Sequence, residues 1–112
     1  IFSHNALQRI SDSNIKELVV TNSIPVSQED RTNYTKIFCE EIAKKGYSPM
    51  IYGNLNSLFS MLNMEELTEY ETWYANYDTL LYYPYQLKIW QYSDSAKVPG
   101  IKTKVDKNII FK

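Results

Sequence analysis

Carboxyl groups are the side chains of this sequence best suited to acid–base chemistry. Asp106 is the strongest candidate because it lies within an apolar strand candidate that includes Ile109 and Ile110. An acid inside such a strand needs a hydrogen-bonding partner or a function, so Asp106 is a candidate catalytic residue. A structural hydrogen bond or an exposed strand face would explain its position equally well.

Cysteine and histidine, the other residues with distinctive chemistry, each occur once. Cys39 can form neither an internal disulfide nor a cysteine metal cluster, and we expect it to be a small buried hydrophobic residue. His4 is expected at the surface or as a helix cap. The sequence therefore predicts no metal site and no cofactor.

The elements that must position these residues alternate between helix and strand. Ser27 and Asp30 have the spacing of a helix cap, and Gly46 stands where a helix-terminating glycine is expected. Asn54 can cap a second helix over residues 55–63, and a short helix is predicted over residues 5–11. Strands are predicted over residues 18–21, 50–52, 72–75, 86–92 and 104–111. Helices between strands imply parallel pairing, so the class is α/β.

The length of 112 residues and the charge pattern limit the other possibilities. One domain with a modest core fits this length, and no apolar run is long enough to span a bilayer. A net charge of −1 gives no overall attraction to nucleic acid. All the charged residues between Lys45 and Lys88 are acidic, whereas lysines are frequent after residue 96. We interpret these as a solvated acidic region and a strand protected from edge pairing, with binding of an anionic cell wall as the alternative.

Four segments, in order and with similar spacing, resemble the last four strand regions of family-25 glycoside hydrolases, lysozymes that cut peptidoglycan. The segments are GYSPMIYGN at 46–54, WYANY at 73–77, IWQYS at 89–93, and VPGI to VDKN at 98–108. With the helix predicted before them, they extend the resemblance over residues 31–112.

The resemblance implies a partial (β/α)8 barrel with about five mostly parallel strands and two to three helices. In such barrels the chemistry lies at the C-terminal ends of the strands. Aromatic rings stack on sugar faces, and amides pair with hydroxyl groups. Besides Asp106, the resemblance therefore implies substrate-binding positions at Tyr52, Tyr74, Asn76, Gln91 and Tyr92.

The catalytic pair of the family does not appear where the resemblance places it. Glycoside hydrolysis normally needs two carboxyl groups, and the family carries an Asp-x-Glu before the helix at 31–45. The sequence here is LVVTNSIP at 18–25, without that motif. Glu29 and Asp30 lie nearby, but their positions fit the first turn of a helix, where acids stabilise the free N–H groups.

Residues 1–25 instead resemble a helix–strand piece of ribose-phosphate pyrophosphokinase, without the loop that holds a phosphoribosyl group. We therefore predict a composite single domain over residues 1–112, in which 1–30 differs in origin from the lysozyme-like half barrel at 31–112. The junction would lie between Pro25 and Arg31.

The resulting hypothesis is a fragment or chimera of a lysozyme (N-acetylmuramidase) that binds peptidoglycan and is catalytically impaired. One alternative is an active muramidase in which Asp106 acts with another acid, such as Asp78 or Asp94. Another is a recombined α/β scaffold with no ligand. Open strand edges predict a homodimer. A natural lysozyme piece would act outside the cytoplasm or at the cell wall, although the sequence itself fixes no compartment.

Overall fold

A helix with well-defined ends begins the main described part of the chain. The computed structural model describes residue 9, residues 12–13 and residues 26–112. Helix α2 (Gln28–Lys44) follows Ser27, whose Oγ accepts a hydrogen bond from the backbone N–H of Asp30 at 3.1 Å. Beyond its other end, Gly46 has a φ of +86°. Both predicted helix signals are confirmed, because each satisfies backbone groups that the helix leaves free.

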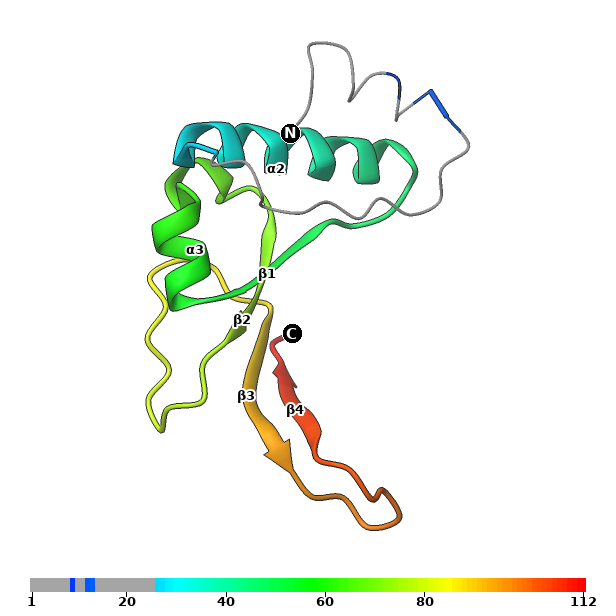
Figure 1. The fold of residues 1–112 in the computed structure, drawn as a ribbon, viewed down its shortest axis with the longest axis vertical. Coiled ribbons are helices and arrows are strands. Elements are labelled where there is room, and N and C mark those ends of the chain that lie inside the picture. Colours follow the sequence, from blue (N-terminus) through cyan, green and yellow to red (C-terminus); the bar gives the residue numbers. More distant parts are fainter. Residues whose placement is uncertain (1–8, 10–11, 14–25) are drawn as a thin grey trace.

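A mixed four-stranded sheet and two short helical elements make up the rest of the described fold (Figure 1). In chain order they are β1 (Met50–Asn54), α3 (Leu55–Met61), the 3-10 helix η1 (Met64–Leu67), β2 (Glu71–Ala75), β3 (Ile89–Ala96) and β4 (Val105–Ile110). Asn54 caps α3 as predicted, in a reciprocal pair of hydrogen bonds with Ser57. The α/β class is thus confirmed.

The strand order is β1-β2-β3-β4, with β1, β2 and β3 parallel. Strand β4 runs antiparallel to β3, and the two form the long hairpin that extends away from the helices in Figure 1. Residues 97–104 are too few for a parallel crossover, which explains the return as a hairpin. The described part of the sheet therefore has three parallel strands and one antiparallel strand.

The core lies where α2, α3 and η1 meet one face of the sheet. Its buried apolar residues are Cys39, Ile51, Leu58, Met64, Leu67 and Tyr74. Cys39 is thus a buried small residue, as predicted. Helix α3 approaches β1 so closely that a Cβ at Gly53 would lie 2.8 Å from a methyl group of Leu58. Only glycine leaves room for this contact.

The barrel prediction is only partly matched by the described residues. They contain four strands in an open sheet and two α-helices, where we predicted about five strands of a partial barrel. The strand expected at 18–21 and the helix expected at 5–11 lie, except for Arg9, outside the described residues. Closure into a barrel therefore stays a prediction. None of the helices in the described ranges combines the length and hydropathy needed to cross a bilayer.

Candidate functional site

The sheet presents polar and aromatic side chains on the face opposite the core. Successive residues of a strand point to opposite faces, so Tyr52 and Trp73, which are register partners, point away from the face of Ile51. Gln91 of β3 and Asn108 of β4 are also partners in the sheet. We call this set, together with Tyr77 from the loop after β2, the Gln91 face. Its residues are Tyr52, Trp73, Tyr77, Gln91 and Asn108.

One buried amide oxygen joins two tyrosines of the Gln91 face. The hydroxyl groups of Tyr52 and Tyr77 each donate a hydrogen bond to Oε1 of Gln91, both at 2.8 Å. Gln91 is only 3% exposed, whereas about half of each tyrosine is exposed. The amide is thus a fixed acceptor beneath two aromatic side chains that solvent can reach. Such a pair combines flat apolar rings with hydroxyl groups of defined direction.

Trp73 continues this surface across the sheet. Its indole N–H donates to Oδ1 of Asn108 at 2.8 Å. Its ring lies edge-on to that of Tyr52, with centroids 5.2 Å apart and an interplanar angle of 72°. Contacts from β1, β2 and β4 therefore hold these rings in a preferred edge-to-face arrangement.

Two carboxylates act electrostatically on Tyr77. Burial raises the pKa of Tyr77 most, and the charges of Asp94 and Asp106 raise it further, together with interactions with Tyr52. Both aspartates are exposed, Asp94 in β3 and Asp106 in β4. Negative charge disfavours the phenolate, so Tyr77 stays a neutral hydrogen-bond donor at neutral pH.

The structure brings together only some of the residues predicted from sequence. Tyr52 and Gln91 are hydrogen-bonded, and the charge of Asp106 contributes to the raised pKa of Tyr77. Tyr74 instead lies in the core, 1% exposed, with its ring centroid 4.9 Å from that of Tyr83. It is therefore placed on the opposite side of the sheet from Tyr52.

The side chains of Asn76 and Tyr92 make other contacts, although the backbone N–H of Asn76 donates to the carbonyl oxygen of Gln91 at 3.0 Å. The backbone carbonyl of Asn76 accepts from the Trp90 indole at 2.8 Å, and its side chain accepts from the Asp78 N–H at 3.0 Å. These bonds shape the loop after β2. Tyr92 packs edge-on against Trp90, with centroids 5.9 Å apart. Both side chains have local structural contacts that account for their positions.

Trp73, Tyr77 and Asn108 belong to the Gln91 face but were not among the predicted site residues. The alternation of side chains along a strand gave part of the information needed to predict Trp73, because Trp73 and Tyr74 must point to opposite faces. Choosing between them required knowledge of which face the helices cover. Asn108 required the β3–β4 register, which contains irregularities between Gln91 and Ala96. No group of three or more potential metal ligands occurs among the residues described.

A solved structure resembles the described fold. The chain superposes on the CTP1L endolysin, whose crystal structure is described as revealing how its activity is regulated by a secondary translation product. The TM-score is 0.63 at 25% sequence identity, over 71% of this chain and 30% of that chain. The chain thus spans less than a third of that endolysin. No curated protein matches the sequence.

The family comparison covers most of the sequence, including its first part. The profile of Glycosyl hydrolases family 25 matches residues 5–101 and therefore runs through the junction expected between Pro25 and Arg31. The comparisons give no support to a composite origin or to a pyrophosphokinase-like piece at residues 1–25. A match over 5–101 of 112 residues, together with the endolysin-like fold, shows that the chain belongs to glycosyl hydrolase family 25.

Proposed function

We propose that this chain forms the saccharide-binding part of a peptidoglycan-hydrolysing lysozyme, with the Gln91 face as the binding surface. The arrangement that carries the proposal is the buried Gln91 oxygen, which holds the hydroxyl groups of two half-exposed tyrosines. Sugar rings offer apolar C–H surfaces and many hydroxyl groups. The Gln91 face offers aromatic rings and polar groups, the combination that such a ligand needs.

The hydrogen bonds of the two tyrosines leave their oxygens available to a ligand. Each hydroxyl uses its hydrogen to bind Gln91, so its lone pairs can accept from a sugar hydroxyl. The amide fixes both rings before binding, which reduces the conformational entropy lost when a saccharide is held. Trp73 extends the surface to a third ring. This arrangement favours an extended oligosaccharide over a single small sugar.

We propose further that the chain does not cut the bound polymer. Hydrolysis needs two carboxyl groups on either side of the scissile bond, roughly 5–9 Å apart. The segment LVVTNSIP at 18–25 lacks the Asp-x-Glu of the family. Asp106, the acid that the family resemblance implies, is exposed in β4, whereas hydrolysis needs two carboxyl groups whose surroundings give them different roles.

Retention on purified peptidoglycan, measured beside release of new reducing ends, tests both parts of this proposal. The chain should sediment with the polymer and release no reducing ends. Tyr52→Ala should sediment less, whereas Tyr47→Ala should behave like the parent. Tyr47 is the matched control because it is also an exposed tyrosine, at 73% exposure. It precedes the N-terminal end of β1, whereas Tyr52 lies within that strand. Absence of retention would contradict the proposal and favour a scaffold without a ligand.

The second candidate function is an active muramidase that uses Asp106 with Asp94. The observation that favours it is that Asp94 and Asp106 are both exposed on the β3–β4 hairpin, and the charges of both contribute to the raised pKa of Tyr77 in the Gln91 face. Reducing ends released by the parent and lost in both Asp94→Asn and Asp106→Asn would establish this function. Asp78→Asn is the control, because Asp78 acts on the core residue Tyr74 instead.

A further inference from the structure

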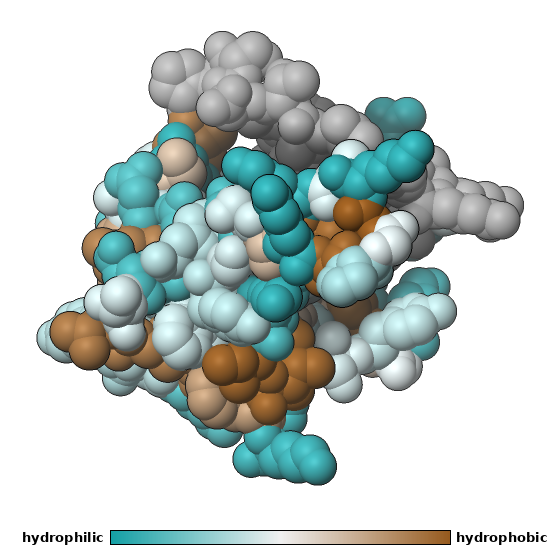
Figure 2. Space-filling model, turned by 90° about the horizontal axis from the view of Figure 1, so that it is seen from below, coloured by the Kyte–Doolittle hydropathy of each residue, from teal (hydrophilic) through white to brown (hydrophobic). Residues whose placement is uncertain are grey.

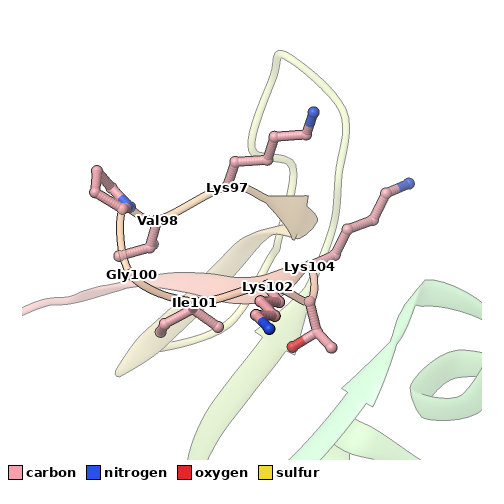
Figure 3. A pocket seen from close by; sticks show the side chains of 8 residues that line it. Lys97, Val98, Gly100, Ile101, Lys102 and Lys104 are labelled. Atoms are coloured by element: carbon pink, nitrogen blue, oxygen red, sulfur yellow. The ribbon is translucent and has the colours of Figure 1, made fainter.

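The loop between β3 and β4 concentrates positive charge. Residues 97–104 include Lys97, Lys102 and Lys104 and contain no acidic residue. All three lysines are exposed. Gly100, at a φ of +88°, turns the chain at the tip of the loop. A shallow hollow lined by the whole loop accompanies this charge, with Val98 and Ile101 contributing apolar surface (Figure 3).

Some lysines of the described fold have a carboxylate partner and others do not, and the loop lysines share the second state with Lys45, Lys107 and Lys112. Lys36, Lys44 and Lys88 each have a carboxylate partner, at 2.6 Å from Glu66, 2.6 Å from Glu41 and 3.8 Å from Glu71. Within the described ranges, the loop lysines have no such ion pair. Three ammonium groups on eight residues repel one another unless an anion lies between them. Their charge is therefore available to a ligand.

The position of the loop relates it to the Gln91 face. The loop follows the C-terminal end of β3 and joins it to β4, and these two strands carry the register partners Gln91 and Asn108. Figure 1 shows the β3–β4 hairpin extending away from the helices, with this loop at its tip. Seen from that end in Figure 2, the apolar surface is divided into patches by pale and hydrophilic areas. Because Gln91 and Asn108 lie in the two strands of this hairpin, an extended ligand on the Gln91 face would continue along it toward the loop.

We propose that the loop at 97–104 binds carboxylates carried on the peptide stems of the same peptidoglycan that the Gln91 face binds. This inference rests on the function proposed above. In Figure 3 the side chains of Lys97 and Lys104 extend toward one side of the loop and that of Lys102 toward another, so the three do not converge on one small anion. Diverging cations match a polymer that carries its negative charges at intervals. The peptide stems supply carboxylates in this way, alongside the glycan.

Charge complementarity between the exposed loop and the polymer sets the expected size of the effect. An exposed ion pair changes an affinity by a factor of roughly 1.5 to 5, so three pairs together should change it about tenfold. Salt screens such pairs over about 8 Å at physiological ionic strength. The loop should therefore contribute most at low salt, whereas stacking on the Gln91 face should depend little on salt.

The test compares two triple variants with equal changes in net charge. One is Lys97→Gln, Lys102→Gln, Lys104→Gln; the control is Lys44→Gln, Lys45→Gln, Lys112→Gln. Each is sedimented with purified peptidoglycan from which phosphate polymers have been stripped, at low and at high salt. The same polymer with its carboxyl groups amidated provides the third arm. A Lys→Arg triple variant of the loop checks that charge, and not the loop structure, is responsible.

The loop variant should bind the stripped polymer about tenfold more weakly at low salt, and amidation should weaken the parent by a similar factor. The control and the arginine variant should bind like the parent. Equal binding by the loop variant and the control would overturn the proposal. Lysine-dependent binding seen only with phosphate-bearing walls would overturn the assignment to peptide carboxylates.

A neutral chitooligosaccharide separates this proposal from the function on which it rests. The loop variant should bind that sugar as the parent does, because the sugar carries no carboxylate. A parent that ignores the neutral sugar yet binds the polymer through its loop lysines would disprove the Gln91 face and retain the lysine site. If the triple variant fails to fold, the single Lys102→Gln exchange should still weaken polymer binding about twofold.

Discussion

The hydroxyl group of Tyr52 donates a hydrogen bond to Oε1 of Gln91 at 2.8 Å, across 39 positions of sequence and between strands that are not neighbours. Tyr77 reaches the same oxygen from the loop after β2. A single amide thus links β1, β3 and the loop between β2 and β3. The amide is buried and both phenols are half exposed, so Gln91 holds two side chains of the protein surface in place.

Replacing Gln91 by leucine should weaken this surface and the fold together. The exchange removes the shared acceptor and leaves two hydroxyl groups to find water, which should lower the free energy of unfolding by about 1–3 kcal/mol. Chemical denaturation measures this loss, and saccharide affinity should fall with it. Gln86→Leu makes the same chemical change at an exposed position and should alter neither quantity. Unchanged stability and affinity in Gln91→Leu would contradict the proposed role of the amide.

The contact between α3 and β1 depends on the absence of a side chain at residue 53. In Gly53→Ala the new methyl group would lie 2.6 Å from Oγ of Ser57 and 2.8 Å from a methyl of Leu58. Helix α3 would have to shift, at a cost of about 1–3 kcal/mol in unfolding free energy. Thermal unfolding of Gly53→Ala beside Gly100→Ala separates packing from backbone strain, because no atom lies within 4 Å of a Cβ at Gly100. A stability of Gly53→Ala equal to that of the parent would exclude the close contact.

Much of the local structure could be predicted from the sequence, because local signals determine it. The capping side chains of Ser27 and Asn54 and the left-handed Gly46 act through neighbouring backbone groups, and all three were predicted. The burial of Cys39 followed from its apolar character. The parallel pairing of β1 and β2 followed from the helix between them.

The site was harder to predict because it depends on which face of each strand is covered. Tyr74 and its neighbour Trp73 are both aromatic, and only the packing of Tyr74 against Tyr83 assigns one to the core. Tyr77 joins the Gln91 face through a loop whose path depends on bonds made by Asn76. Such contacts join segments far apart in sequence, and periodicity within one segment carries no information about them.

Burial of Tyr74 should make stability sensitive to alkaline pH. Burial, and then the charge of Asp78, raises the pKa of Tyr74 above its ordinary value of 10.0. Below pH 10 the phenol is neutral in both states and its contribution is complete. Above that pH the unfolded chain loses the proton first, so the unfolding free energy falls as pH rises.

Urea unfolding from about pH 8 to pH 11 measures this dependence. Tyr74→Phe cannot ionise and should lose less stability over the range than the parent. The remaining loss should come from other groups, including Tyr77 and Tyr83, whose pKa values are also raised mainly by burial. Identical pH dependence in the parent and in Tyr74→Phe would contradict the core position of this phenol.

We also predict self-association of the isolated chain. Strands β1 and β4 form the two edges of the described sheet, and Ile109 and Ile110 of β4 are exposed. Unpaired edges favour pairing with another chain, and a symmetric dimer is the commonest closed arrangement. Light scattering after size-exclusion chromatography should give twice the mass of 13.2 kDa. A single monomeric species across the concentration range would contradict this prediction.

Binding of a neutral sugar to the Gln91 face is the central claim, and titration of tryptophan fluorescence with chitooligosaccharide tests it most directly. Trp73 lies 5.2 Å from Tyr52 between ring centroids, so a bound sugar should change its emission in a saturable way. Tyr52→Ala should weaken this response at least several-fold, whereas Tyr47→Ala should preserve it. A saturable change that requires Tyr52 would support the account. No change in the parent, or an equal change in Tyr52→Ala, would contradict it.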